Sequence, residues 1–169
     1  MNLEKKTYVV RFERSPEVKI TESSPIITYG VGFRNDNMVA EVYLGLNVVP
    51  LLPGFYIITA VIYRPGKPNQ VWEAQLTPKG FLCYDKQRGL KNYGEYKKGM
   101  MAEYFKSSYD VLPGEDFTGY NEALVATNKL FDGTHGDPRI CDFDLSDLPD
   151  IPEKEIFLEL VEYLENELK

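Results

Sequence analysis

The sequence is poor in the residues on which most catalytic and metal sites depend. His135 is the single histidine among 169 residues, which excludes any mechanism or metal site that needs two histidines. The sequence also lacks a phosphate-binding Gly-x4-Gly-Lys-Ser/Thr loop, a Gly-x-Ser-x-Gly elbow, a His-Glu-x-x-His pair and a Cys-x-x-Cys pair. We therefore predict no enzymatic activity, no cofactor and no bound metal ion.

Cysteine and long apolar runs are also scarce. Cys83 and Cys141 lie far apart, and because no signal peptide precedes them we expect two reduced thiols rather than a disulfide. No run of eighteen apolar residues occurs, so we expect no segment that spans a bilayer and no membrane partner. The expected location is the cytosol or the inside of a virus or phage particle.

Two polar clusters leave minor alternatives open. Asp132, His135 and Asp137 share a glycine-rich loop, although such loops are usually turns. A second set of oxygen ligands has partial EF-hand spacing, with an aspartate at the position of the turn glycine. Its members are Asp142, Asp144, Ser146, Asp150 and Glu153. Irregular cation binding by these carboxylates is the alternative that this pattern leaves. An enzyme, such as a carboxylate-only hydrolase, or a small-ligand barrel also stays open, because paired acids meet in space rather than in sequence.

The first half of the sequence has the pattern of β-strands. Apolar and polar residues alternate over short runs, which Gly, Pro, Asn and Asp separate. The expected strands cover residues 7–14 with 18–20, 27–33, 38–46, 55–64, 71–76 and 81–84. About six or seven strands within residues 6–84 predict an antiparallel β-sheet curled into a barrel or a small sandwich.

Helical spacing replaces this alternation after residue 94. Tyr96–Phe105 and Tyr120–Phe131 are helix candidates, and the last segment has a clear apolar stripe that begins after Asp150, the expected cap. We expect one α+β domain over residues 1–169, in which two or three helices pack on the sheet. Its parts are a β-rich basic body (1–93), a helical region (94–131), an Asp-rich strap (132–152) and an amphipathic C-terminal helix (153–169).

The charge is divided unevenly along the chain. Residues 1–108 hold 15 basic and 10 acidic residues, whereas residues 109–169 hold 4 basic and 16 acidic residues, within a net charge of −7. In the strap, carboxylates alternate with apolar side chains, as in a segment that docks on a partner or on the protein's own basic surface. Our main hypothesis is a non-enzymatic protein-binding or assembly component that contacts another protein, or a second copy of itself, through this segment and its strand edges. The candidate partner-binding residues are Phe143, Leu145, Leu148, Ile151, Phe157, Leu160 and Leu164.

The alternative hypothesis is a single-stranded nucleic-acid-binding protein whose acidic C-terminus inhibits its own binding surface. Its candidate residues interleave cations for phosphates with rings for bases, and are Lys86, Arg88, Lys91, Tyr93, Tyr96, Lys97 and Lys98. In outline, a basic β-rich body ahead of an acidic end resembles single-stranded-DNA-binding proteins of the oligonucleotide-binding fold. Those proteins typically end in a flexible acidic tail with a terminal aromatic residue, whereas this chain ends in a predicted helix, and no motif supports assignment to that family.

Overall fold

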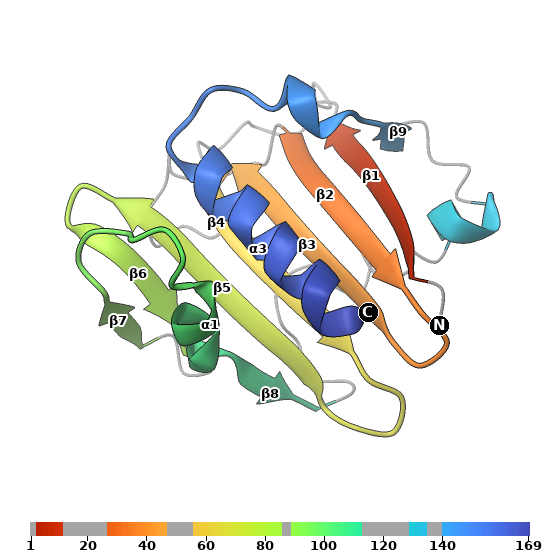
Figure 1. The fold of residues 1–169 in the computed structure, drawn as a ribbon, viewed down its shortest axis with the longest axis horizontal. Helices are drawn as coiled ribbons and strands as arrows, with labels where there is room; N and C mark the ends of the chain where they lie inside the picture. Colours follow the sequence, from red (N-terminus) through yellow and green to blue (C-terminus); the bar gives the residue numbers. More distant parts are fainter. Residues whose placement is uncertain (1–2, 12–26, 47–55, 86–88, 113–128, 135–139) are drawn as a thin grey trace, which may run out of the picture.

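The fold is described from a computed structural model that places residues 3–11, 27–46, 56–85, 89–112, 129–134 and 140–169 (Figure 1). The strands are β1 (Glu4–Arg11), β2 (Ile27–Arg34), β3 (Val39–Leu46), β4 (Tyr56–Tyr63), β5 (Asn69–Thr77), β6 (Gly80–Tyr84), β7 (Leu90–Asn92), β8 (Tyr109–Val111) and β9 (Ile140–Asp142). The described helices include α1 (Met101–Tyr104), α3 (Glu153–Leu168) and the two 3-10 helices η1 (Phe105–Ser107) and η2 (Leu145–Asp147), and residues 129–132 are also helical. Six of these strands were predicted, while the predicted extension at 18–20 lies outside the described residues.

The strands form one antiparallel sheet that stays open. β1 to β6 are neighbours in chain order, β9 is added outside β1, and β7 is added outside β6. β8 pairs with the part of β5 that β6 leaves uncovered. The end strands β7 and β9 do not pair with each other, so the prediction of a closed barrel or a sandwich is wrong, whereas the antiparallel sheet with helices is confirmed. The alternating pattern showed that each strand has a buried face, but it carries no information on what covers that face.

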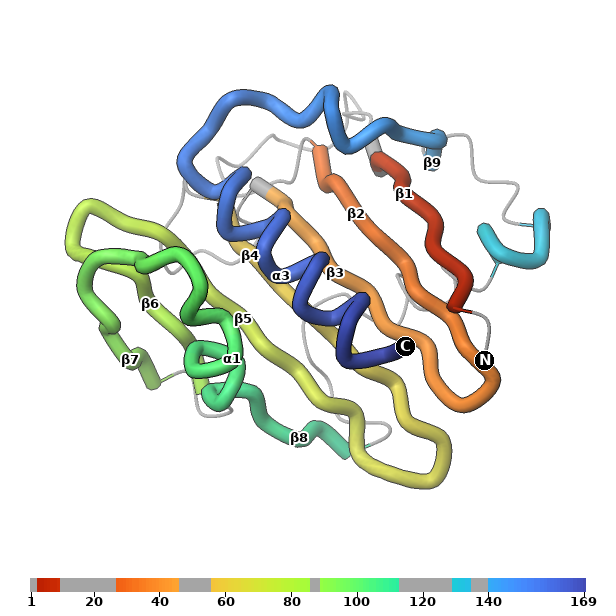
Figure 2. The backbone as a smooth tube through the Cα atoms, viewed as in Figure 1, coloured from red at the N-terminus to blue at the C-terminus, as the bar shows by residue number. Residues whose placement is uncertain are grey.

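One face of the sheet is covered by α3, which lies over β3 and β4 and runs along them (Figure 2). Phe157, Leu160 and Leu164 recur every three or four residues along the helix and have no exposed surface. They belong to one core with the apolar side chains that β2 to β6 turn toward the helix. Each such burial contributes about 1.5–3 kcal/mol relative to an exposed side chain. Among the described residues, no helix is long and apolar enough to cross a membrane.

The start of α3 differs from the prediction. Asp150 was expected to cap the helix, but the cap residue is Pro152 and no side chain caps it with a hydrogen bond. Proline fits this place because its fixed φ suits a first helical turn and the missing N–H would have no partner inside the helix. Glu153 follows in the first turn, and burial raises the pKa of its carboxyl group.

The described part of residues 94–131 contains less helix than the spacing predicted. Within the part of this region that the structure describes, helix is confined to α1, η1 and residues 129–132. Gly94 and Gly99 have φ values of 73° and 85°, a left-handed conformation that no α-helix contains. Residues 93–100 are therefore an irregular loop, and Tyr109–Val111 joins the sheet as β8. Most of the second predicted helix lies outside the described residues.

Trp72 of β5 fixes α1 and η1 on the sheet. Its indole N–H donates a hydrogen bond of 2.9 Å to the carbonyl oxygen of Tyr104, and its ring lies 6.1 Å from that of Phe105. The side chain has no exposed surface, so this hydrogen bond has no competition from water. The short helix, which is too short to be stable alone, is therefore held by tertiary contacts.

Gly30 of β2 provides the space for the ring of Tyr8 on the neighbouring strand β1. A Cβ atom at residue 30 would lie 2.4 Å from Tyr8 Cζ. We expect Gly30→Ala to lower the free energy of unfolding by about 1–3 kcal/mol, because the added methyl group overpacks this site. In a Tyr8→Ala background the same substitution should have almost no effect, since the clashing atoms are gone. Urea unfolding of the four proteins of this double-mutant cycle measures the difference.

Gly45→Ala is the control, because a Cβ there meets the Thr28 Oγ1 atom at 3.0 Å, and that hydroxyl can rotate away. We expect it to be the milder of the two glycine substitutions. An equal cost of Gly30→Ala with and without the Tyr8 ring would show that the close approach is not what requires glycine.

Candidate partner-binding site

The apolar side chains that we predicted to contact a partner point into the protein itself. Phe157, Leu160 and Leu164 are fully buried on the side of α3 that faces the sheet, and Leu148 is 5% exposed. The remaining predicted residues, which are Phe143, Leu145 and Ile151, are half-buried and pack against the same core. Leu148, Phe157, Leu160 and Leu164 are therefore core residues, whereas the half-buried Phe143 and Leu145 also line an open groove beside Lys5.

The strap is fastened to the edge of β1. β9 pairs antiparallel with Tyr8–Val10 of β1, and the backbone N–H of Phe143 extends this ladder by a 3.2 Å hydrogen bond to the Thr7 carbonyl oxygen. The Thr7 hydroxyl donates to the carbonyl oxygen of Phe143. The Phe143 ring then turns toward the helix side and lies 5.0 Å from the ring of Tyr29. This agrees with the prediction that the segment could lie on the protein's own body.

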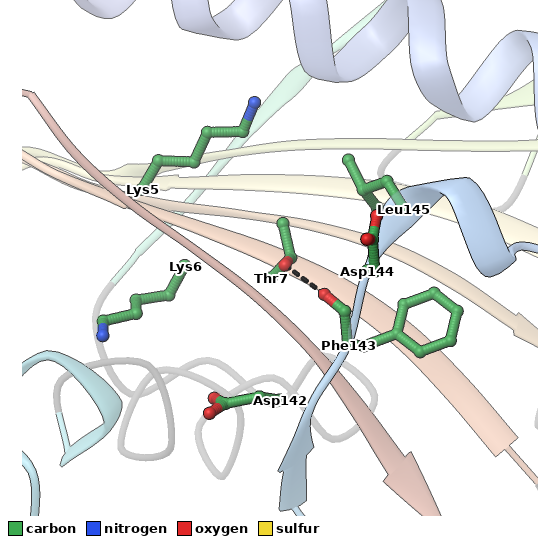
Figure 3. Close-up of a pocket in the computed structure, with 7 residues that line it drawn as sticks. All are labelled: Lys5, Lys6, Thr7, Asp142, Phe143, Asp144 and Leu145. Carbon is green, nitrogen blue, oxygen red and sulfur yellow. Dashed lines mark hydrogen bonds between the residues drawn. The ribbon is translucent and has the colours of Figure 1, made fainter.

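The ladder along β1 ends where the strap turns inward, and an open groove begins there (Figure 3). In an antiparallel strand, the N–H and C=O groups of alternate residues point to the same side. The Thr7 carbonyl points to β9, so the N–H and C=O of Lys5 also point outward from the sheet. Among the described residues, no strand pairs with this part of β1 on its outer side. The groove measures about 660 Å³ and is lined by Lys5, Lys6, Thr7, Asp142, Phe143, Asp144 and Leu145.

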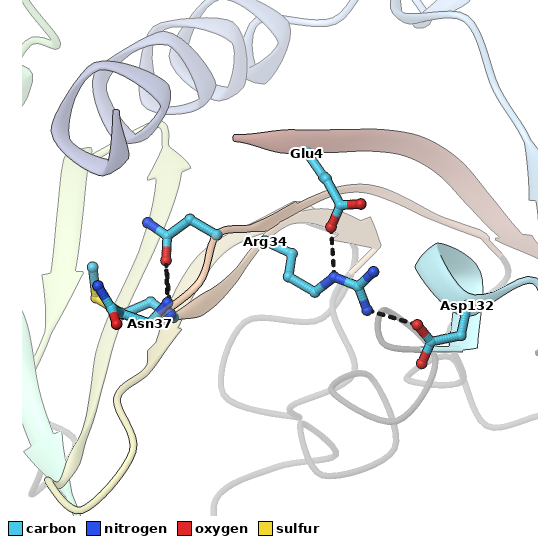
Figure 4. A network of polar contacts seen from close by, with 6 residues as sticks. Glu4, Arg34, Asn37 and Asp132 are labelled. Atoms are coloured by element: carbon cyan, nitrogen blue, oxygen red, sulfur yellow. Dashed lines mark hydrogen bonds and ion pairs between the residues drawn. The ribbon is translucent and has the colours of Figure 1, made fainter. Parts of the chain in front are cut away.

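Several charges beside the groove already have partners. The ammonium group of Lys5 lies 3.2 Å from a carboxylate oxygen of Glu165 on α3. Arg34 of β2 bridges Glu4, at 2.6 Å, and Asp132, at 2.8 Å (Figure 4). The hydrogen bonds to Glu4 and then to Asp132 raise the pKa of this guanidinium group. The bridge therefore ties residues 129–134 to the β1–β2 pair.

Asp144 also has a partner within the strap. Its carboxylate accepts a hydrogen bond from the backbone N–H of Ser146 at 3.0 Å and so caps η2, which lowers the pKa of the Asp144 carboxyl group.

Two charged side chains at the groove differ from Lys5, Arg34 and Asp144. Lys6 and Asp142 are exposed, and neither has an ion-pair partner among the residues that the structure describes.

The segment predicted to bind nucleic acid is only partly described, because Lys86 and Arg88 lie outside the described residues. Tyr93 and Tyr96 are half-buried, and their rings lie 5.0 Å and 5.4 Å from the ring of Tyr104. Burial, and after it the carboxylate of Glu159, raises the pKa of Tyr96. Lys91 lies over the outer face of Tyr93, 4.7 Å from the ring centre. Both rings are thus engaged within the protein and do not form an exposed platform for bases.

The cations at the end of this segment lie next to the acidic side of α3. Lys97 and Lys98 are exposed, and Lys98 lines a second groove with Glu155, Glu159 and Glu162 of the helix. The backbone N–H of Gly99 donates a 3.2 Å hydrogen bond to Glu159. The basic loop and the acidic helix are therefore neighbours in the fold, which accounts for part of the charge division along the sequence.

The sheet face opposite α3 contains polar residues that the sequence did not single out as buried. Glu41, Thr59, Glu73 and Gln75 alternate with residues that face the helix, and each is at most 1% exposed. The hydroxyl group of Tyr109 donates to Glu73, and that of Tyr84 donates to Gln75. The tyrosines of the strands were the available signal in the sequence, because a tyrosine on a strand face can supply a hydrogen bond to a buried polar neighbour.

Comparisons with protein-family models, with curated proteins and with solved structures gave no significant match to this chain.

The two cysteines provide a chemical test of the placement of β6 and β9. Neither is in a disulfide, and Cys141 is exposed on β9, whereas Cys83 is buried on β6. Burial raises the pKa of the Cys83 thiol to about 12, so little of it is thiolate at pH 8. We expect one thiol to react rapidly with a disulfide reagent such as Ellman's reagent at that pH, and the second to react only after unfolding in urea. The variants Cys83→Ala and Cys141→Ala assign the two phases, and rapid reaction of Cys83 would contradict the packing of β6.

Proposed function

We propose that this protein is a non-enzymatic binding component that takes an extended segment of another protein as an added strand along β1. The observation that carries the proposal is the outward-facing backbone of Lys5, which borders an open groove at the place where the β9 ladder ends. Strand addition uses main-chain hydrogen bonds for affinity and side-chain contacts for specificity. The expected location of the protein remains the cytosol or the inside of a virus or phage particle.

The strap contributes to this site with its backbone and its polar atoms. It pairs with the outer edge of β1 from Thr7 to Val10, so it defines where an added strand must stop. Asp142 and Phe143 form one end of the groove, and Lys5 and Lys6 form its wall on β1. The acidic C-terminal segment is thus part of the proposed site, although its apolar side chains are used in the core.

The free length of β1 limits the strength of binding. Each main-chain hydrogen bond contributes about 0.5–1.5 kcal/mol net, and this edge offers few of them. We therefore expect an affinity in the micromolar range or weaker for an isolated segment. Two lysines in succession also disfavour direct pairing of this edge with the same edge of a second copy, because the like charges would face one another. A different protein is consequently the preferred partner.

The nucleic-acid alternative has less support. It needs exposed rings on which bases can stack, and Tyr93 and Tyr96 are packed against Tyr104. The acidic side of α3 also lies beside Lys98 and would repel phosphate groups. Lys91 and Lys97 stay exposed, and the alternative would have to rest on them together with the two cations outside the described residues.

Lys5→Pro tests the proposed function. Proline removes the outward N–H of residue 5, and because this group does not pair with β2, the edge strand should tolerate the change. We expect binding to an array of short random peptides to weaken roughly three- to tenfold, as the loss of one main-chain hydrogen bond predicts. Lys5→Ala is the matched control, since it also removes the ion pair with Glu165 but keeps the N–H. Fluorescence anisotropy of selected labelled peptides gives the dissociation constants, and circular dichroism verifies that each variant is folded.

Retained binding by folded Lys5→Pro would place the peptides elsewhere on the protein and overturn the proposal. A complete absence of peptide binding by the wild-type protein would also overturn it. Binding of labelled oligo-dT that weakens with salt, and that Lys97→Glu abolishes, would favour the nucleic-acid alternative instead.

A further inference from the structure

We propose that the segment bound at β1 carries an acidic side chain opposite Lys6 and a basic side chain beside Asp142. This inference rests on the proposed function, because it names the chemistry of the partner for the same groove. It follows from which charges at the groove are already paired and which are not.

Lys6 and Asp142 lie on one side of the sheet edge. Successive residues of a strand point to opposite faces, so Lys6 shares its face with Tyr8, and Tyr8 is directly opposite Asp142. Figure 3 shows Lys6 and Asp142 on the same side of β1, while Lys5 extends toward α3. In this arrangement Lys6 and Asp142 are diagonal neighbours on adjacent strands, and the Cα atoms of such neighbours are typically about 7–8 Å apart. Both are exposed and border the groove.

The other charges around the groove are already engaged. Lys5 is paired with Glu165, and Glu4 is paired with Arg34, which also holds Asp132. The carboxylate of Asp144 caps η2. A partner segment that met these groups would have to break an existing interaction, whereas contacts with Lys6 and Asp142 break no ion pair among the described residues.

The geometry of the edge sets where along β1 each of the two partner residues lies, whichever direction the partner chain runs. An added strand pairs with the outer edge of β1 near Lys5, and it ends opposite Lys6 because Phe143 is bonded to Thr7. The partner residue opposite Lys6 lies on the same face as the lysine, where an opposite charge stabilises a cross-strand pair. Beyond this point the partner chain leaves the ladder and passes Asp142, so a basic side chain within the next two residues meets that carboxylate.

The test uses three blocked peptides that share one Thr- and Val-rich sequence and differ at two positions, two residues apart. One peptide has an acid and a base at these positions, one has two acids, and one has two bases. The wild-type protein should bind the acid–base peptide most tightly. Lys6→Glu leaves two acidic groups at the groove and should prefer the two-base peptide, while Asp142→Lys leaves two basic groups and should prefer the two-acid peptide.

The expected preference is about three- to tenfold at low salt, from one or two exposed cross-strand charge pairs, and it should shrink as the salt concentration rises. Dissociation constants come from fluorescence anisotropy of the labelled peptides. Lys79→Glu is the control, because it makes the same charge change as Lys6→Glu at an exposed residue in the turn between β5 and β6. It should keep the wild-type ranking.

The outcomes separate this inference from the proposed function. Equal binding of the three peptides by wild type, lost in Lys5→Pro, would retain strand addition at β1 and overturn the assignment of charges. An unchanged ranking in folded Lys6→Glu and Asp142→Lys would do the same. If the folded wild-type protein binds none of the peptides, the proposed function fails and the inference fails with it.

Discussion

The packing of α3 across the sheet is the contact on which the rest of the structure depends. An open antiparallel sheet has two faces, and one of them is almost entirely apolar here, so it needs a cover that a closed barrel would not. The buried stripe of Phe157, Leu160 and Leu164 supplies that cover over the central strands. α1 and η1 extend it over β5 and β6 through Trp72. The place of α3 also decides two polar contacts, the ion pair of Glu165 with Lys5 and the hydrogen bond that the backbone N–H of Gly99 donates to Glu159.

The second constraint is the edge of the sheet. Unpaired main-chain groups at an edge attract other strands, and proteins limit this by short end strands and by lysines. Both devices are present, because β7 and β9 have three residues each and Lys5 and Lys6 lie on β1. The strap covers only part of β1 and then turns inward at Phe143, whose ring packs against the ring of Tyr29. A partly protected edge of this kind is the feature on which the proposed strand addition rests.

Much of the fold was available from the sequence, and the reasons for the failures are physical. Alternation located six strands, and the stripe after residue 152 located α3, because both patterns repeat over several turns or pleats. The two three-residue end strands and β8 were missed, since so short a run has no recognisable period. Gly99 lies inside the predicted helix at 96–105, and its left-handed φ value shows why most of that helix is absent.

The candidate site was harder to predict than the fold. The seven apolar residues were chosen for a partner because their pattern is amphipathic, but an amphipathic stripe has the same pattern whether it packs on its own sheet or on another protein. Lys6 was not singled out, because its place beside the end of the β9 ladder depends on the contact of Thr7 with Phe143, which lies 136 residues later in the chain. Likewise, Glu41 and Glu73 have the alternation of outward-facing residues, and only the tertiary structure shows them buried.

The position of α3 in the chain has a consequence for biosynthesis. Every strand of the sheet precedes α3 in sequence, and the strand pair that it covers, β3 and β4, is complete about ninety residues earlier. During translation the apolar face of these strands therefore emerges from the ribosome well before its cover. Contacts of such long sequence separation form slowly, and an uncovered sheet surface is prone to association in the meantime. The growing chain thus passes through a stage in which it would be a natural client for chaperones that bind exposed apolar strands.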